Sequence, residues 1–258
     1  MLEGKTVLIT GVGSGLGREL AVQAVKDGAN AVIGARTREQ LESVAQEADP
    51  SGQRIAVVPT DITDPQACAG IVAEAERRFG ALDGLVQVAA YEYAMGGLFD
   101  SDFEAWRKSF ETNVLGTLSL LREAAPAMKR ASGGSIVLIG SQSMYLPLIE
   151  QMGYAASKGA LLSSMYYLAK ELGPDGIRVN TVVPSWMWGP PVELYLKLQA
   201  KARGTSPEAV KQEIERGIPL GTMAADEDVA QAVIFFLSDR SRRITGQTLL
   251  VNGGELMR

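Results

Sequence analysis

The chain has 258 residues, 46% of them hydrophobic, and a formal net charge of −5. A weakly acidic chain is a poor general binder of nucleic acid or of anionic membranes, so we expect neither as a partner. It contains no histidine and a single cysteine, Cys68, which excludes an internal disulfide and a Cys–His nucleophile. Cys68 is therefore expected to fill space on an apolar helix face.

Hydropathy along the chain indicates a cytoplasmic protein. The first ten residues, MLEGKTVLIT, lack the apolar core of a signal peptide. No stretch approaches the eighteen or so uninterrupted apolar residues that a membrane span needs. We therefore expect no membrane partner.

Short apolar runs alternate with helical patterns along the chain. The predicted strands are Thr6–Thr10, Ala31–Ala35, Ile55–Pro59, Gly84–Ala89, Ser135–Ile139, Arg178–Val183 and Thr248–Val251. Predicted helices include Leu16–Asp27, Arg38–Ala48, Pro65–Phe79 and Phe103–Lys129. Most strands are apolar throughout, as expected for strands covered on both faces. The alternation predicts one α/β domain over residues 1–258, with a parallel sheet of about seven strands between helices.

The segment from Ser185 to Gly221 interrupts this rhythm. It contains two short helical patterns and no strand, and Ser206-Pro207 is a typical helix start. A segment of this length inserted between two strands is often a binding element. We predict a substrate lid at about 185–221.

A glycine-rich turn follows the first predicted strand, in TVLITGVGSGLGREL. Gly11, Gly13, Gly15 and Gly17 would let backbone N–H groups approach a pyrophosphate at the start of the next helix, where the helix dipole favours negative charge. The alternative is a glycine-rich turn without a ligand.

A second motif combines Ser141, Tyr154 and Lys158. Residues four apart lie on one helix face, so Tyr154 and Lys158 can converge. Ser141 follows a predicted strand, near the carboxyl edge where open parallel sheets bind ligands. The same Tyr-x-x-x-Lys spacing recurs at Tyr166 and Lys170. Tyr166 would lie about 18 Å further along the helix, so we assign that second pair to packing and surface.

Together these motifs resemble the classical short-chain dehydrogenase/reductase family over essentially the whole chain. The resemblance rests on TGVGSGLG, on Asp61 in PTDIT, on Asn113 in ETNVLG, on Ser141, Tyr154 and Lys158, and on RVNTVVP and ITGQTLLVNGG. It implies a Rossmann-like doubly wound sheet and an NAD(P)-dependent oxidoreductase that interconverts a secondary alcohol and a ketone. The implied catalytic residues are Asn113, Ser141, Tyr154 and Lys158. The implied coenzyme contacts are Gly11, Ser14, Gly15, Leu16, Gly17, Arg36, Asp61, Ile62, Ala89, Tyr154, Lys158, Pro184 and Met187. No metal is expected.

The expected chemistry needs no histidine. A free tyrosine has a pKa of about 10, and a neighbouring ammonium together with an oxidised nicotinamide would lower it. Tyr154 could then exchange a proton with the substrate while hydride moves to or from the nicotinamide. Ser141 would hold the substrate oxygen. In the family, Asn113 positions a water that connects Lys158 to solvent. Asp61 has an alternative role in a turn or helix cap.

The sequence departs from the family pattern in two places. Gln87-Val88-Ala89-Ala90 stands where the family has Asn-Asn-Ala-Gly. Ser185 follows Pro184 where the family has glycine, and Gly189 occupies the position of a threonine that helps hold the nicotinamide carboxamide. Backbone groups around Met187 could hold that amide instead.

Apolar side chains follow several predicted strand ends and predict an apolar substrate pocket. They are Tyr91, Tyr93, Met95, Met144, Tyr145, Trp186, Met187 and Trp188. The predicted substrate contacts among them are Tyr91, Tyr93, Met144, Trp186 and Trp188. The alternative is a core under the lid or a subunit contact.

The second strand predicts which nicotinamide coenzyme is used. An NAD site has a carboxylate at its end, whereas this chain has Ala35 followed by Arg36, with Arg38 close by. A guanidinium binds phosphate well, so we favour NADP(H) over NAD(H). The alternative is that both arginines only decorate the surface. Ser14 stands where NADP users often have a second basic residue.

Resemblance also implies a homo-oligomer, a tetramer paired through helices corresponding to Phe103–Lys129 and Gly153–Leu172. The second of these is apolar around more than one face, which suits burial against another subunit. Two other functions stay open: a catalytically silent NAD(P)-binding regulator or scaffold, and a lyase or epimerase acting on a nucleotide sugar. The chain length leaves little room for the larger C-terminal domain of the latter.

Overall fold

A computed structural model describes all residues from 1 to 258 and contains one seven-stranded parallel sheet. The strands run in the order β3-β2-β1-β4-β5-β6-β7, and every neighbouring pair is parallel. Their bounds are β1 Thr6–Thr10, β2 Asn30–Ala35, β3 Ile55–Pro59, β4 Gly84–Gln87, β5 Gly134–Ile139, β6 Ile177–Pro184 and β7 Thr248–Val251. The order reverses direction between β1 and β4, which is the point where open α/β sheets bind ligands.

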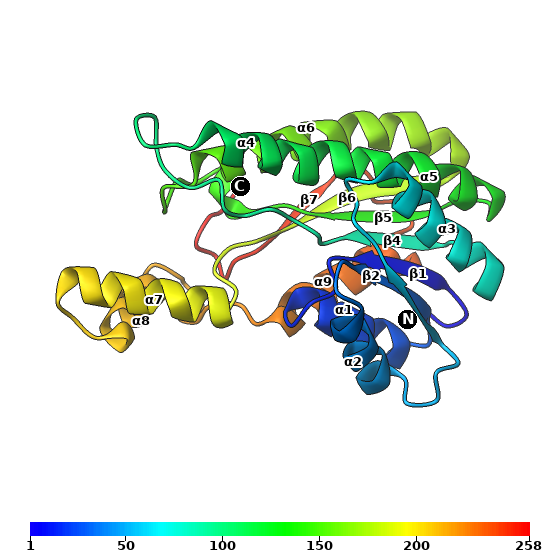
Figure 1. Cartoon of the computed structure of the whole chain (residues 1–258), viewed down its shortest axis with the longest axis horizontal. Coiled ribbons are helices and arrows are strands. Elements are labelled where there is room, and N and C mark those ends of the chain that lie inside the picture. The colour runs from blue at the N-terminus through cyan, green and yellow to red at the C-terminus, as the bar shows by residue number, and fades with distance from the viewer.

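Helices cover both faces of the sheet. One layer contains α1 Leu16–Lys26, α2 Arg38–Ala48 and α9 Asp226–Leu237 (Figure 1). The other contains α3 Pro65–Phe79, α4 Phe103–Phe110, α5 Thr117–Arg130 and α6 Met152–Leu172 (Figure 1). Each layer buries its own apolar core against the sheet, of 24 and 22 residues respectively. The predicted Rossmann-like, doubly wound sheet of about seven strands is confirmed.

Local sequence explains the helix boundaries. Asp64 precedes α3 and accepts a hydrogen bond from the backbone N–H of Gln66, with Pro65 in the first turn. The helix ends at Gly80, whose φ of 82° is left-handed. Cys68 is fully buried on this helix, and the pKa of its thiol is raised to about 11 by burial, which makes it an inert filler as expected.

Several predicted elements, among them β2, β5, β6 and α1, differ from the structure by one residue at an end, and two differ by more. β4 ends at Gln87 rather than Ala89, because the chain turns there to meet the glycine-rich loop. The single helix predicted over Phe103–Lys129 is interrupted by a π-helical turn, Glu111–Gly116, between α4 and α5. π-helical turns inside α-helices occur frequently at functional sites, and this one contains Asn113.

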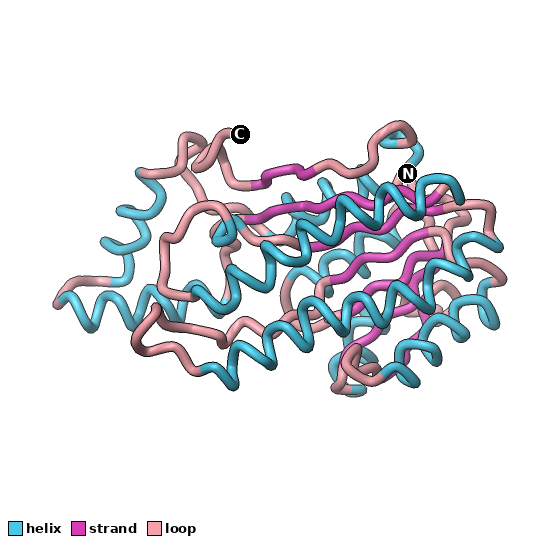
Figure 2. The backbone as a smooth tube through the Cα atoms, turned by 90° about the horizontal axis from the view of Figure 1, so that it is seen from above, coloured by secondary structure: helices cyan, strands magenta, loops and turns pink.

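The predicted lid forms a helical hairpin of α7 Pro190–Arg203 and α8 Pro207–Arg216. It extends away from the sheet beyond the carboxyl ends of the strands (Figures 1 and 2). Ser206 caps α8 by accepting from the N–H of Ala209. The hairpin has a small core of its own, whose fully buried members are Leu196, Ala200 and Val210. No helix in the protein is both long and apolar enough to span a bilayer.

Candidate functional site

The glycine turn packs tightly on one side and is open on the other. Gly11 has a φ of 75°, and a Cβ there would lie 2.3 Å from the backbone nitrogen of Ala89. A Cβ on Gly17 would lie 2.4 Å from the carbonyl oxygen of Gly11. These two glycines therefore let the turn close against β4 and α1. A Cβ on Gly13 would meet nothing within 4 Å.

The amino end of α1 is available to an anion. Gly15 occupies the N-cap position, and no side chain accepts a hydrogen bond from the first turn. The unpaired N–H groups of a helix start and its dipole form a ready site for a phosphate. The turn and helix start thus fit a pyrophosphate, with Ser14, Leu16 and Gly17 on the loop that would surround it.

Asp61 and Arg36 lie beside each other at the ends of β3 and β2. The Oδ1 atom of Asp61 accepts hydrogen bonds from the Thr63 N–H at 2.9 Å and the Thr63 hydroxyl at 2.7 Å. These bonds, reinforced by the positive charge of Arg36, lower the pKa of Asp61. The turn role that the sequence left open for Asp61 is therefore present. Arg36 is exposed and forms no ion pair, while Arg38 pairs with Glu42 at 3.6 Å.

Gln87 supplies a brace at the end of β4, where the family pattern has asparagine. Its Oε1 accepts a 2.8 Å hydrogen bond from the Thr10 hydroxyl on β1. Its Nε2 donates to the hydroxyl of Thr117 at 2.7 Å and to the carbonyl of Ala89 at 3.1 Å. The longer amide thus ties β4 to β1 and to α5, and fixes the loop that carries Ala89.

Tyr154 and Lys158 meet in the buried first turns of α6. Tyr154 is 9% exposed and Lys158 is 3% exposed. The Lys158 ammonium lies 5.7 Å from the centroid of the Tyr154 ring and donates a 2.8 Å hydrogen bond to the carbonyl of Ile139 at the end of β5. The helix spacing therefore brings both groups to the carboxyl edge of the sheet, next to Ser141. Tyr166, by contrast, is 52% exposed, as expected for the second pair.

Burial dominates the ionisation of this pair. It raises the pKa of Tyr154 above its usual range, the negative charge of Glu92 acts in the same direction, and a hydrogen bond with Ser141 opposes both. It lowers the pKa of Lys158 to about 8, against the raising effect of Glu92. Burial of Tyr154 thus favours the protonated phenol.

Asn113 has its side chain fully engaged within the π-helical turn. Its Oδ1 accepts from the N–H of Tyr91 at 2.7 Å. Its Nδ2 donates to the hydroxyl of Ser157 at 2.9 Å and also to the carbonyl of Tyr91 and the hydroxyl of Ser109, both at 3.1 Å. This amide therefore fixes the loop after β4 to Ser157 of α6, whose hydroxyl donates to the carbonyl of Tyr154 at 2.7 Å.

The side chains predicted to contact substrate have four different sets of neighbours in the structure. Trp186 lines a cavity beside Ser141, and its ring lies 5.3 Å from that of Tyr195 on α7. Trp188 packs under the Lys211 ammonium of α8 at 4.7 Å. Tyr91 and Tyr93 form an edge-to-face pair with centroids 5.6 Å apart, and Tyr93 is 76% exposed. The Cε atom of Met144 lies 3.2 Å from where a Cβ on Gly140 would stand.

The cavity beside Ser141 is lined by residues of two segments. Seven of the nine lining residues follow β5 and two come from the start of the lid: Ser141, Gln142, Ser143, Leu146, Leu148, Ile149, Gln151, Ser185 and Trp186. The Ser141 hydroxyl lies 2.9 Å from the hydroxyl of Ser143. A substrate oxygen held by Ser141 would thus have polar neighbours on one side and aliphatic side chains on the other.

Glu255, near the C-terminus, joins the loops around this cavity and was missed in the sequence. Its carboxylate accepts hydrogen bonds from Gln142 Nε2 at 2.7 Å, from Trp186 Nε1 at 3.3 Å and from the hydroxyl of Ser185. Asn252 adds a 2.6 Å bond to the carbonyl oxygen of the Gln142 side chain. Ser185 stands where the family pattern has glycine. This serine was the only local sign in the sequence that the start of the lid makes an additional polar contact.

Glu92 is the second functional candidate that sequence reasoning missed. Its side chain is exposed, and it lies in the loop between Tyr91 and Ala94. Asn113 holds Tyr91 at one end of this stretch, and at the other end the carbonyl of Ala94 accepts a 3.4 Å hydrogen bond from the N–H of Tyr154. Its charge raises the pKa of both Tyr154 and Lys158. Only its position between two predicted pocket tyrosines could have signalled this role.

Comparison with known proteins agrees with the geometry. The family model described as enoyl-(acyl carrier protein) reductase matches residues 11–255. An L-rhamnose 1-dehydrogenase (NAD(P)(+)) of Sphingomonas sp. strain SKA58 is 32% identical over 256 residues, which cover 98% of this chain and 97% of the relative. A 3-oxoacyl-[acyl-carrier-protein] reductase of Thermotoga maritima is 32% identical over 253 residues, covering 98% of both chains.

Solved structures give the same result. The crystal structure of an NAD+-bound xylitol dehydrogenase superposes with a TM-score of 0.91 at 27% identity, covering 98% of this chain and 99% of that one. The same family is indicated by the fold, the glycine cradle, the tyrosine–lysine pair and the sequence relatives, and the relatives match nearly the whole chain. The protein is an NAD(P)-dependent oxidoreductase and belongs to the classical short-chain dehydrogenase/reductase family.

Proposed function

We propose that the protein interconverts a secondary alcohol and a ketone, with Tyr154 as the acid and base. The observation that carries this proposal is the convergence of Tyr154, Lys158 and the Ser141 loop at the carboxyl edge of β5, beside the open glycine cradle. When bound, the nicotinamide coenzyme would supply or accept the hydride.

Tyr154 holds the proton that the reaction moves. In ketone reduction its phenol donates the proton to the developing alkoxide, which fits the raised pKa that keeps the hydroxyl protonated. In alcohol oxidation the same oxygen receives the proton. The Ser141 hydroxyl orients the substrate oxygen and stabilises the charge that develops on it. Lys158, with a pKa of about 8, holds or releases a proton next to Tyr154 near neutral pH.

NADP(H) is the proposed coenzyme. The glycine turn and the start of α1 would hold the pyrophosphate, and Asp61 with Ile62 would flank the adenine. Ala89, Pro184, Met187 and Lys158 would hold the nicotinamide half. Arg36 would pair with the 2′-phosphate, since its guanidinium has no carboxylate partner in an ion pair and no acid stands at the end of β2.

The substrate is proposed to have an apolar body. Leu146, Leu148, Ile149 and Trp186 offer apolar surface beside Ser141, while Gln142 and Gln151 offer hydrogen bonds at the same cavity. Such a lining suits a ketone whose carbonyl faces Ser141 and whose apolar part rests against Trp186.

The test is a screen of ketones and alcohols followed by nicotinamide absorbance, with NADP(H) and NAD(H) in parallel. Tyr154→Phe should lose at least about 100-fold in turnover while the fold and coenzyme affinity persist, since one oxygen atom is removed. Tyr166→Phe is the matched control on the same helix and should change little. A Tyr154→Phe variant retaining more than about a tenth of the rate would exclude this mechanism. Coenzyme binding without any turnover would favour a silent regulator.

We also propose a homo-oligomer, with a tetramer as the expected state. Phe103, Leu115, Tyr166 and Tyr167 are apolar side chains more than half exposed on the outer surface of the α4–α6 layer. Exposed apolar patches of this kind mark association surfaces. Sedimentation at micromolar concentration tests it, and a monomeric mass would exclude it.

A further inference from the structure

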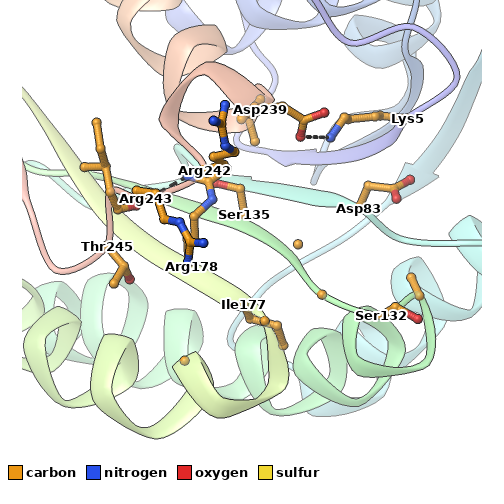
Figure 3. A pocket seen from close by; sticks show the side chains of 17 residues that line it. Lys5, Asp83, Ser132, Ser135, Ile177, Arg178, Asp239, Arg242, Arg243 and Thr245 are labelled. Carbon is orange, nitrogen blue, oxygen red and sulfur yellow. Dashed lines mark hydrogen bonds and ion pairs between the residues drawn. The ribbon is translucent and has the colours of Figure 1, made fainter.

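A second pocket lies at the opposite edge of the sheet from the coenzyme cradle. Its lining residues precede or begin β1, β4, β5, β6 and β7, so they all lie at the amino ends of parallel strands. We call it the amino-end pocket and define it by Lys5, Asp83, Ser132, Arg178, Asp239, Arg242 and Arg243, which Figure 3 labels. Its volume is about 570 Å³, within the range of small-molecule sites.

Positive charge exceeds negative charge around this pocket. Four cationic side chains line it, against the two carboxylates Asp83 and Asp239. Asp83 accepts a 2.8 Å hydrogen bond from the N–H of Thr6. Asp239 is bound by Lys5 at 2.7 Å, and its pKa is lowered first by that bond and further by the charges of Lys5, Arg178 and Arg242. One carboxylate thus serves three cations, in a chain whose overall charge is −5.

The arginines differ in what they are bound to. Arg178 is held in place by 2.8 Å bonds to the hydroxyl of Ser241 and the carbonyl of Phe236, so its charge faces dipoles rather than a carboxylate. Burial lowers the pKa of Arg178, and the negative charge of Asp239 opposes that effect. Arg242 and Arg243 are exposed, and their side chains form no hydrogen bond or ion pair. Figure 3 shows the three arginines grouped together beside the Lys5–Asp239 pair.

The opposite wall is narrow and fixed. Gly133 has a φ of 122°, and a Cβ there would lie 2.6 Å from the carbonyl of Gly176, so the loops before β5 and β6 touch. Ser132 is the only non-glycine residue with positive φ, at 70°, and sits at this rim. Only four of the seventeen lining residues are hydrophobic, which suits a polar ligand.

We infer that the amino-end pocket binds a small molecule bearing two or more phosphate groups. Guanidinium groups match phosphate oxygens in paired, charge-assisted hydrogen bonds, and two of them are free here above a third that is already fixed. The volume admits a nucleotide as well as inorganic polyphosphate. This site is separate from the reaction described above, because the pocket and the Tyr154 loop lie at opposite ends of the strands.

Calorimetric titration of the full-length protein tests the inference. Inorganic triphosphate and ATP are each titrated at constant ionic strength, into protein saturated with NADPH or NADH so that the glycine cradle is filled. Binding should weaken at least about tenfold in Arg242→Gln and in Arg243→Gln, and stay unchanged in Arg107→Gln, an exposed arginine on α4. Tighter binding of ATP than of triphosphate would indicate a nucleotide, and the reverse would indicate inorganic polyphosphate.

Three outcomes would overturn the inference. The first is the absence of binding heat with either probe. The second is heat that disappears when the dinucleotide is present and that, without dinucleotide, is the same in Arg242→Gln and Arg243→Gln, which would place the probe in the glycine cradle. The third is an affinity of the wild type for citrate equal to its affinity for triphosphate, or an affinity for triphosphate that is the same in the wild type and in the two arginine variants. Neither result is compatible with phosphate held by Arg242 and Arg243.

Discussion

The ammonium of Lys158 donates a 2.8 Å hydrogen bond to the carbonyl of Ile139, the last residue of β5. This bond joins the helix that carries Tyr154 to the strand end that carries Ser141. It also buries a cation, and burial lowers the pKa of Lys158 from 10.5 to about 8. The position proposed to serve the reaction is thus one where the charge of Lys158 is unfavourable for folding.

The unfavourable burial of the Lys158 charge predicts that the stability of the protein depends on pH. Between about pH 8 and about pH 10.5 the unfolded state holds the Lys158 proton and the native state does not. The contribution of Lys158 to the free energy of unfolding therefore rises with pH in this range. Relative to Lys158→Met, the wild type should gain about 2 kcal/mol in free energy of unfolding between about pH 7.5 and about pH 10. Urea unfolding at both pH values measures this. Lys170→Met, exposed on the same helix, is the control, and a pH-independent difference for Lys158→Met would contradict the prediction.

Glu92 is expected to set the pH range of catalysis. Its negative charge raises the pKa of both Tyr154 and Lys158, so removing it should lower both. Glu92→Gln should therefore shift the pH profile of kcat/KM for alcohol oxidation toward lower pH, by less than about one unit because the side chain is exposed and screened. Glu104→Gln, an exposed acid on α4, should leave the profile in place. A shift toward higher pH would rule this role out.

Glu255 is expected to act as a positioning residue for the substrate cavity. Glu255→Ala leaves the hydrogen-bond donors of Gln142, Ser185 and Trp186 without their shared acceptor. Substrate KM should rise about tenfold, while the KM for coenzyme stays near its wild-type value, since bonds to a charged group contribute about 1.5–3 kcal/mol. Glu255→Gln keeps one acceptor oxygen and should recover part of the loss.

The outcome that separates positioning from general destabilisation is the comparison of the two KM values. If Glu255→Ala raises both equally, or if Glu255→Gln is no better than Glu255→Ala, the carboxylate does not position the cavity. Glu227→Gln, an exposed acid on α9, serves as the matched control.

The lid is expected to open in two parts. The α7–α8 hairpin packs on a small core of its own, whereas its base is held by a 2.9 Å bond from the Trp188 N–H to the carbonyl of Ala224 and a 3.1 Å bond from the Ala224 N–H to the carbonyl of Trp186. Hydrogen exchange should therefore be fast in Pro190–Arg216 and slow at residues 186–188, with hairpin protection rising when coenzyme binds. Equal exchange rates in the hairpin and the sheet would contradict this.

Local patterns in the sequence were sufficient for most of the fold. Apolar runs gave β1, β3 and β7 with their observed bounds, because glycine or polar residues follow each run in the sequence. The π-helical turn at Glu111–Gly116 has no periodicity of its own, so the sequence predicted one continuous helix. Spacing on one helix placed Tyr154 and Lys158 together, since four residues make about one turn.

Contacts between segments that lie far apart in the chain could not be predicted from the sequence. Glu255 meets Ser185 across seventy residues of sequence, and nothing local marks a carboxylate near the C-terminus as the acceptor for the lid. The effect of burial on Tyr154 was also not predicted, because it depends on how completely the fold encloses the phenol. The lowering of the pKa expected with a bound oxidised nicotinamide stays a prediction. The substrate contact predicted for Trp188 stays a prediction, and the sequence did not indicate that its ring would pack under the Lys211 ammonium of α8.

Arg36 is expected to decide which coenzyme is preferred. It lies next to Asp61, close enough to lower the pKa of that carboxyl, and it forms no ion pair of its own, whereas Arg38 is already paired with Glu42. A 2′-phosphate at the end of β2 would give this guanidinium a charged partner. The attraction between Arg36 and the phosphate would offset the repulsion between the phosphate and the Asp61 carboxylate. We therefore expect kcat/KM to favour NADP(H), and Arg36→Ala to reduce that preference by about tenfold or more, mainly through the KM for NADP(H). Arg38→Ala is the matched control two residues away and should change the ratio little. A wild-type preference for NAD(H) of about tenfold, or an unchanged ratio in Arg36→Ala, would show that Arg36 is only a surface residue.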